Sequence, residues 1–199
     1  SSDLFPGAEI TTEPGAADGT IVATKPADIA AVTAAVSASG GGRILSIAAG
    51  VTLATLEAAA GSGVAVVRAM PNTPALIGAG ASAIAGGAAA EDADLDWAES
   101  LLGAVGAVVR VTEKQLDAVT GLSGSGPAYV FLIAEAMVDA GVAAGLPRDL
   151  STTLAYQTLV GSARLLAEGD VSPADLRAAV TSPGGTTAAG VQVLERNAV

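Results

Sequence analysis

The 199-residue sequence contains no cysteine and no histidine, and only 3% of its residues are aromatic. Without cysteine it has no disulfide, no thiolate nucleophile and no zinc–thiolate centre. Without histidine it lacks the commonest general base and the commonest metal ligand, which excludes every Ser-His-Asp mechanism. Acid–base chemistry must therefore come from carboxylates, lysines, hydroxyls, water or the substrate itself, and we expect no metal site.

Basic residues are also scarce. Nine lysines and arginines face twenty acidic residues, giving a formal net charge of −11. Nucleic acids and anionic membranes both require clustered basic side chains, so neither is expected as a partner. The longest apolar stretch, 127–134, is too short to span a bilayer, and the opening residues 1–6 lack the pattern of a secretory signal. We therefore expect a soluble protein. A sequence without cysteine is compatible with the reducing cytoplasm, which is the expected location.

The first half of the chain alternates short apolar runs with helical patterns, which is typical of a parallel βαβ sheet. A hydrophobic fraction of 51% is sufficient for a core in one large domain or two small ones. Among the helices, 92–102 has the clearest amphipathic spacing. The expected strands are 20–24, 43–48, 65–69, 81–85 and 107–111, and the expected helices between them are 28–38, 52–60 and 92–102.

After about Thr112 the strand signal stops and helices dominate. Ser125 is a candidate N-cap for a helix with Gly126 and Pro127 in its first turn. That helix is apolar on nearly all sides, which predicts that it is buried, and in a small domain a second copy of the chain is the simplest cover. We expect a homodimer, with domains at 1–112 and 113–199. Further helices are expected over 147–168, 172–180 and from 186 onward.

The stretch 180–189, Val-Thr-Ser-Pro-Gly-Gly-Thr-Thr-Ala-Ala, lies between two of these helices. Its glycines allow the backbone to approach a ligand, and Thr186 or Thr187 can cap the helix that follows. A carboxylate at that helix start would meet unpaired N–H groups and the positive end of the helix dipole. The stretch is therefore a candidate anion pocket; the alternative is a tight helix–helix connection without a ligand.

Two further motifs are Met-Pro-Asn-Thr-Pro at 70–74 and Leu-Asp-Ala-Val-Thr-Gly-Leu-Ser-Gly-Ser-Gly-Pro-Ala-Tyr at 116–129. Together with 180–189 they resemble, in order and approximate spacing, pyrroline-5-carboxylate reductase, the enzyme that makes proline. The resemblance runs from about Ile21 to the end of the sequence. It implies an α/β fold, with a truncated Rossmann-like parallel sheet domain followed by an all-α dimerisation domain. It also implies a homodimer, and leaves a higher homo-oligomer open.

The cofactor implied by the resemblance is NADP, with NAD as the alternative. The sequence has no G-x-G-x-x-G at its first strand, and the G-x-G-x-x-A pattern at 78–83 leads into a strand, so we interpret it as a chance match. The resemblance thus implies a sequence that begins part-way through the cofactor domain and ends within a shortened final helix. The implied cofactor residues are Ala23, Thr24, Lys25, Pro26, Ala69, Met70, Pro71 and Asn72. Alternatively, Lys25 is an ordinary surface lysine and 70–74 is a proline-rich turn.

For the substrate, the resemblance implies that Thr187 hydrogen-bonds the ring nitrogen while the N–H groups of Gly185 and Thr186 hold the carboxylate. Glu113, Asp170 and Val171 are the other implied substrate residues. In a dimer these residues need not come from one chain. Alternatively, Glu113 is a solvated first-turn carboxylate and Asp170 a residue of a loop at a helix end. Asp170 stands where many relatives carry the longer glutamate.

The implied reaction is hydride transfer from NAD(P)H to the imine carbon of 1-pyrroline-5-carboxylate, giving L-proline. A protonated imine is already electrophilic, so this chemistry needs no histidine. A serine hydrolase is improbable, because 121–126 fails the G-x-S-x-G spacing; we interpret that run as a tight turn into a capped helix. The alternatives are a non-catalytic dimeric fragment that cannot bind a dinucleotide, and a related reductase acting on another imine.

Overall fold

The computed structural model describes residues 13–197 and divides the chain into two compact units, 1–130 and 131–199. The opening residues 1–6, which entered the expectation on localisation, lie outside the described residues. Up to Asn197, where the described residues end, the elements after the last strand are all helices, as the sequence predicts. The division between the units falls within the long helix α5 (Gly126–Ala143). The predicted domain boundary at 112/113 falls shortly after the last strand, and the two domains on either side of it stay a prediction.

The first unit contains a five-stranded sheet in the order β1-β2-β3-β4-β5. All five predicted strands and the three helices between them are present. The sheet differs from the predicted parallel one at a single place, because β4 runs antiparallel to β3, with Met70 opposite Ala83. The strands are β1 (Gly19–Val22), β2 (Arg43–Ser46), β3 (Val66–Met70), β4 (Gly80–Gly86) and β5 (Gly106–Arg110).

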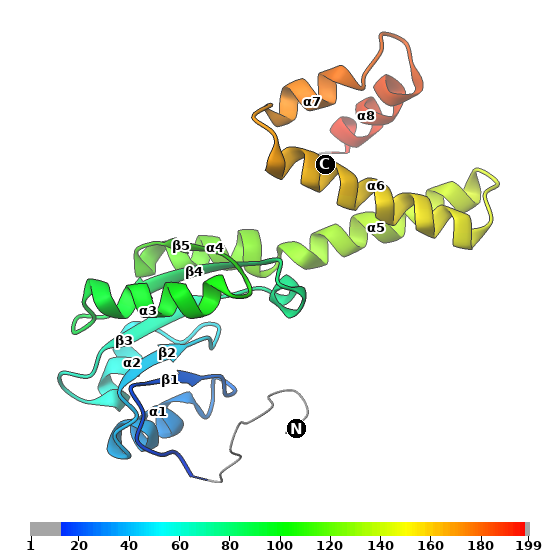
Figure 1. Cartoon of the computed structure of the whole chain (residues 1–199). Coiled ribbons are helices and arrows are strands. Elements are labelled where there is room, and N and C mark those ends of the chain that lie inside the picture. The colour runs from blue at the N-terminus through cyan, green and yellow to red at the C-terminus, as the bar shows by residue number, and fades with distance from the viewer. Residues whose placement is uncertain (1–12, 198–199) are drawn as a thin grey trace. The chain divides into compact units, whose positions relative to one another are not determined.

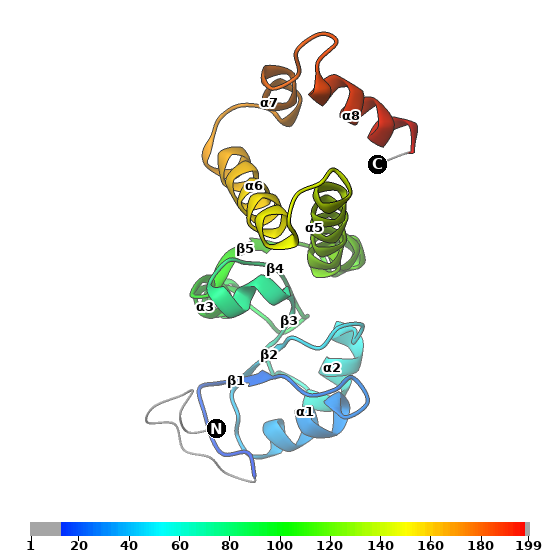
Figure 2. The same cartoon turned by 90° about the vertical axis from the view of Figure 1, so that its right-hand side faces the viewer.

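Helices cover both faces of this sheet, as Figure 2 shows. On one face α1 (Ile29–Ala38) and α2 (Leu53–Ala60) pack on the inward side chains of the first strands, and Leu56 and Ile44 are fully buried there. On the other face α3 (Asp92–Gly103) packs through Ala98 and Leu102 against Leu45, Val67 and Ile84. In the three central strands β2, β3 and β4, alternate residues thus belong to opposite cores, which is the period of two expected for a strand buried on both faces.

The antiparallel turn between β3 and β4 contains a short 3-10 helix, η1 (Thr73–Ile77). After β5 the chain forms η2 (Glu113–Gln115), α4 (Leu116–Val119) and a π-helical segment, η3 (Thr120–Gly124), and then enters α5. The expected tight turn with a Ser125 cap is wrong. Ser125 has helical backbone angles, and its N–H donates to the Thr120 carbonyl in the wider spacing of a π-helix.

The second unit consists of helices (Figure 1): the rest of α5, α6 (Arg148–Glu168), α7 (Pro173–Ala179) and α8 (Thr186–Arg196). Between α5 and α6 the buried Ser151 hydroxyl donates to the Val138 carbonyl at 2.8 Å. A Cβ on Gly141 would come within 2.1 Å of that hydroxyl oxygen, so the close approach of the two helices requires glycine. Arg177 on α7 and Glu195 on α8 form an ion pair at 3.3 Å.

Candidate functional site

A cavity of about 640 Å³ opens at the carboxyl ends of the parallel strands in the first unit. Ile21 on β1, Ile47 after β2 and Met70 at the end of β3 contribute apolar side chains to its lining. Leu76 of η1 and Leu101 of α3 add to the same surface, and Asn72 supplies an amide. In sheets of this kind, ligands bind just beyond the carboxyl ends of the strands. This cavity is therefore the candidate cofactor site within this unit.

Asn72 uses both ends of its side-chain amide to hold the backbone around this cavity. Its Nδ2 donates to the Ser123 carbonyl at 3.0 Å, and its Oδ1 accepts from the Ala81 N–H at 2.8 Å. The half-buried side chain thereby links the end of β3, the start of β4 and the π-helical segment. The sequence singled out Asn72 as a cofactor residue, but these two bonds give it a positioning role that the sequence did not reveal.

The Ser-Gly-Ser-Gly-Pro-Ala-Tyr motif also works through backbone contacts. The Thr120, Ser123 and Tyr129 hydroxyls donate to the carbonyls of Leu116, Val119 and Gly121, respectively, at 2.8, 3.2 and 3.2 Å. Gly124 lies so close to Met70 that a Cβ there would be 2.5 Å from its terminal methyl carbon. The motif thus forms a wide helical turn beside the cavity, in which side-chain hydroxyls add hydrogen bonds to backbone carbonyls.

The segment Ala23–Pro26 follows β1 at the same edge of the sheet. Ala23, Lys25 and Pro26 are exposed, whereas the hydroxyl oxygen of Thr24 is buried and has no hydrogen-bond partner among the described residues. A buried hydroxyl without a partner is costly, and a polar group of a ligand would relieve that cost. On β3, Ala69 is buried against α3, so only its backbone faces the strand end, while Met70 and Pro71 are half-buried.

Glu113 lies on η2, and its half-buried carboxylate is bound by other groups of the protein. Its Oε1 accepts hydrogen bonds from the Arg68 guanidinium at 3.0 Å and from the backbone N–H of Leu53, the first residue of α2. Arg68 is the one charged residue that is buried among those the structure describes. The sequence did not single out Arg68, although an arginine inside the apolar strand Val-Val-Arg-Ala-Met is a signal that it needs an internal partner.

In the second unit, Gly185 is the N-cap of α8, and Gly184 before it has a left-handed φ of +71°. The expected threonine cap is absent, because α8 has no side-chain cap bond. The N–H of Gly185 is also already engaged, donating to the Ser182 carbonyl at 3.1 Å. Thr186 and Thr187 are exposed in the first turn, where backbone N–H groups point out of the helix without intrahelical partners.

Asp170 and Val171 are exposed in the connection between α6 and α7. The Gly185–Thr187 segment follows the opposite end of α7. Within one chain, α7 therefore lies between these two groups of expected substrate residues. The Ser172 hydroxyl caps α7 by accepting from the Asp175 N–H at 3.2 Å, which fixes where the connection ends.

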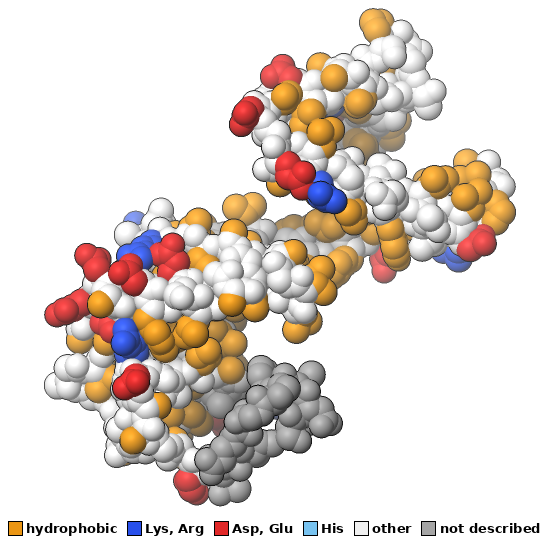
Figure 3. Space-filling model, in the orientation of Figure 1, with side chains coloured by type: hydrophobic (Ala, Val, Ile, Leu, Met, Phe, Trp, Pro, Cys, Tyr) orange, Lys and Arg blue, Asp and Glu red, His pale blue; other side chains and the backbone are white. Residues whose placement is uncertain are grey.

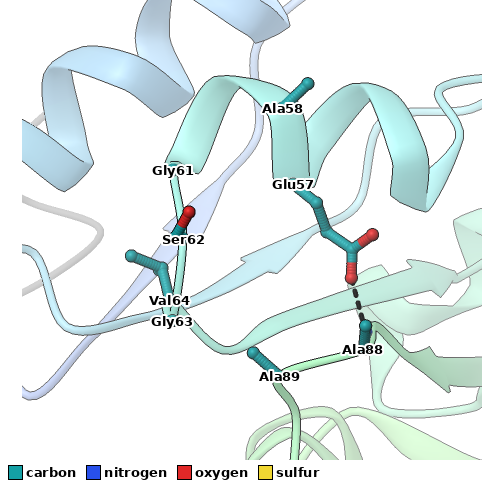
Figure 4. A pocket seen from close by; sticks show the side chains of 8 residues that line it. All are labelled: Glu57, Ala58, Gly61, Ser62, Gly63, Val64, Ala88 and Ala89. Carbon is teal, nitrogen blue, oxygen red and sulfur yellow. Dashed lines mark hydrogen bonds between the residues drawn. The ribbon is translucent and has the colours of Figure 1, made fainter.

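A smaller cavity of about 410 Å³ lies at the carboxyl end of α2 (Figure 4). Its lining includes one carboxylate, Glu57, which accepts a hydrogen bond from the Ala88 N–H. The remaining lining residues are small or apolar, namely Ala58, Gly61, Ser62, Gly63, Val64, Ala88 and Ala89. Because Glu57 is already engaged and the cavity lies near the start of β3, away from the carboxyl ends of the strands, we do not assign it a ligand.

A mostly parallel sheet with a cavity at the carboxyl ends of its parallel strands, followed by a helical region, is the arrangement of Rossmann-like dinucleotide-binding proteins with an added helical domain. Residues 113–199 match the family model described as pyrroline-5-carboxylate reductase dimerisation. The chain is 46% identical to the pyrroline-5-carboxylate reductase of Mycobacterium tuberculosis, over 88% of this chain and 68% of that protein. The chain belongs to the pyrroline-5-carboxylate reductase family.

Other relatives agree with this assignment. The pyrroline-5-carboxylate reductase of a Synechocystis species is 49% identical over 88% of this chain and 66% of its own length. The structure of the Coxiella burnetii pyrroline-5-carboxylate reductase matches with a TM-score of 0.85 and 39% identity, covering 91% of this chain and 68% of that one. The Plasmodium falciparum pyrroline carboxylate reductase, solved with NADP bound, matches with a TM-score of 0.83 and 34% identity, over 91% and 70% of the two chains.

The run Glu113–Ala143 is, within the described residues, the one helical stretch long and apolar enough to cross a membrane. Length and composition alone do not separate a membrane span from a helix that is buried between subunits. The family model that matches this run is a dimerisation domain, which favours cover by another copy of the chain.

Proposed function

We propose that this protein catalyses the NAD(P)H-dependent reduction of 1-pyrroline-5-carboxylate to L-proline. The observation that carries the proposal is a family match that extends through the sheet unit and the helical region alike. The absence of histidine from the sequence is compatible with it, because a protonated imine accepts hydride without a histidine acid.

The residues at the carboxyl edge of the sheet fit a nicotinamide cofactor. The cavity offers an apolar surface for a flat ring, and the buried Thr24 hydroxyl lacks the polar partner that a ligand would supply. We propose that Ala23–Pro26 and Ala69–Asn72 contact it, with Lys25 near its negative charge and Ala69 contributing backbone only. NADP is the expected form, since the Plasmodium falciparum relative was solved with NADP bound, and NAD is the alternative.

For the substrate, we propose that its carboxylate binds at the N-terminus of α8. The N–H groups of Thr186 and Thr187 are the better donors there, because that of Gly185 is engaged with Ser182. Their unpaired hydrogens and the helix dipole both favour an anion. Asp170 and Val171 belong to the same proposed site through a second copy of the chain, since one chain separates them from Thr187 by the length of α7.

The bound NAD(P)H supplies the hydride for the imine carbon of the substrate. This chain's own contribution is to bind and orient the ring. The Thr187 hydroxyl, exposed in the first turn of α8, hydrogen-bonds the ring nitrogen, while the first-turn N–H groups fix the carboxylate. Holding two points of a small ring in this way orients its imine carbon for attack.

We further propose that the protein works in the cytoplasm as a homodimer, with a higher homo-oligomer as the alternative. The support is the dimerisation-domain match and the exposed apolar side chains of α5, including Phe131 and Leu132, which are 61% and 65% exposed in the single chain. Figure 3 shows hydrophobic side chains on the visible surface of the helical region. Large exposed apolar surfaces of this kind are typical of subunit interfaces.

The test is oxidation of NADPH, then NADH, by the purified protein with 1-pyrroline-5-carboxylate, with proline assayed as the product. We expect proline to form in proportion to the cofactor oxidised. A folded, dimeric protein that oxidises neither cofactor would favour the alternative of a non-catalytic fragment. Oxidation with a different cyclic imine but not with this one would favour the related reductase.

A further inference from the structure

The strand β3 contains a buried arginine, Arg68. Arg68 is 6% exposed, and its neighbours Val67 and Ala69 face the core on the opposite side of the sheet. A buried guanidinium without an anion would be strongly destabilising, so Arg68 requires a permanent partner. That partner is Glu113, at 3.0 Å.

The same carboxylate oxygen of Glu113 accepts a second hydrogen bond. Its Oε1 also accepts from the N–H of Leu53, at the positive end of the α2 dipole. The backbone on both sides of Glu113 is fixed as well, because Thr112 and Gln115 form a capping box in which the Thr112 N–H donates to Gln115 Oε1 at 2.9 Å. These contacts hold the carboxylate in place before any ligand binds. A substrate that displaced it would leave the buried Arg68 charge without a partner.

The location of this pair connects it to the site. Arg68 lies two residues before Met70, and Leu53 lies four residues after Ala49; Met70 and Ala49 both line the cavity. Glu113 is also the first residue matched by the dimerisation family model. One carboxylate thus joins β3, the start of α2 and the beginning of the helical region.

We infer that Glu113 is a positioning residue, which acts through Arg68 and the Leu53 N–H to hold the carboxyl end of β3 and the start of α2 beside the cofactor, and does not contact the substrate. The role in cofactor binding rests on the proposed function. The coupling between Glu113 and Arg68 does not, and it is measured separately.

The experiment compares Glu113→Gln, Arg68→Met and the double variant with the unaltered protein. Glutamine keeps an acceptor for Leu53 but removes the charge that Arg68 needs, and methionine preserves much of the arginine volume without a charge. We expect each single variant to lower kcat/KM about tenfold to a hundredfold, through a higher KM for NADPH and a lower kcat, because sub-ångström misplacement at a reacting site has effects of this order. The KM for the imine should not change.

The double variant should be no worse than the poorer single variant, since both changes remove one interaction. Arg68→Lys should recover part of the activity, because it restores the buried cation. Glu57→Gln is the matched control: this carboxylate also accepts a backbone N–H, from Ala88, but lies away from the candidate site. It should leave both KM values unchanged.

A selective rise in the KM for the imine in Glu113→Gln, with Arg68→Met unaffected, would overturn the inference and make Glu113 a substrate ligand. Strictly additive losses in the two single variants would also contradict it. If the unaltered protein shows no turnover, the proposed function fails first. Thermal unfolding of the same four proteins then still decides whether Glu113 and Arg68 are coupled, and NADPH fluorescence titration decides whether they affect cofactor binding.

Discussion

The two units of the chain bury their apolar side chains to very different extents. In residues 13–130, large side chains such as Ile44, Leu45 and Ile84 are fully buried on the two faces of the sheet. In the described part of 131–199, the buried residues are Val138, Ser151 and Ala155. Each of α5, α6 and α8 carries large apolar side chains that are about half exposed or more, including Phe131, Leu154 and Val193. The sheet unit therefore has its own core, whereas the helical unit has helices whose apolar faces need another surface.

This difference explains how an all-round apolar helix exists in a protein with strong negative charge. Secondary structure in the helical unit is set by local sequence and by contacts such as Ser151 with Val138. Its tertiary stability, in our account, comes from a second copy of the chain. The same dependence links assembly to activity, because the proposed substrate residues lie at the two ends of α7.

Placing a charge on α5 should have the largest effect. Phe131→Asp introduces a carboxylate on a side chain that is 61% exposed in the single chain and buried in the proposed dimer. Because an unpaired buried charge costs several kcal/mol, we expect association to weaken about a hundredfold or more, with a parallel loss of activity. Light scattering after gel filtration gives the mass. Val109→Asp on β5, where the side chain is 56% exposed, is the matched control and should leave the mass unchanged.

A cavity in the sheet core should have the next largest effect. Ile44→Ala removes a fully buried side chain and should lower the free energy of unfolding by about 2–5 kcal/mol, whatever the protein concentration. Leu154→Ala, on α6, removes a side chain that is 51% exposed in the single chain, so its cost should depend on protein concentration through the dimer. Urea melts at two concentrations measure both. If the free energies of unfolding of the two variants depended equally on protein concentration, the proposed difference between the units would be wrong.

Removing the Thr187 hydroxyl should impair catalysis without affecting dimer formation. We expect Thr187→Ala to lower kcat about tenfold to a hundredfold, because the variant loses one hydrogen bond that strengthens as the reaction proceeds. The mass of the protein and its NADPH binding should stay unchanged. Steady-state kinetics with both substrates varied make the measurement. Undiminished turnover from the folded variant would remove Thr187 from the mechanism.

The exposed charge cluster of the sheet unit should contribute least. Arg110 on β5 bonds to Asp96 and Glu99 of α3, and these hydrogen bonds, that to Asp96 first, raise the pKa of Arg110. Its folded pKa therefore lies above the unfolded value. This stabilisation is complete below the unfolded pKa and is lost as the pH rises from there through the folded pKa, far above neutrality. We expect Arg110→Gln to leave Tm and its dependence on pH near neutrality unchanged, because exposed ion pairs contribute little. Calorimetry at two salt concentrations is the test.

Much of the fold was predictable because its signals are local. Alternating apolar runs located all five strands, and caps such as Ser172 located the starts of helices. The antiparallel β3–β4 pair was not predicted, because strand direction depends on the tight η1 turn and on the Asn72 bond to Ala81. The π-helical segment was also missed. Its glycines and serines are typical of a turn, and the contacts that accompany the helical conformation include a bond from the distant Asn72 to the Ser123 carbonyl.

The site was predictable to a smaller degree. Motif resemblance identified Asn72 and Glu113, but not that their side chains bind the protein's own backbone and Arg68. Such pairings join residues that are 45 and 51 positions apart, so no local pattern reveals them. The direct roles of Thr187, Asp170 and Lys25 toward ligands stay predictions.

The most direct test of the central claim is specific activity measured across a dilution series, with the mass of the protein determined in the same samples. The account predicts that turnover per chain falls as the dimer dissociates, because the helical unit and its substrate residues are completed by a second copy. A monomer that retains full turnover per chain would contradict it.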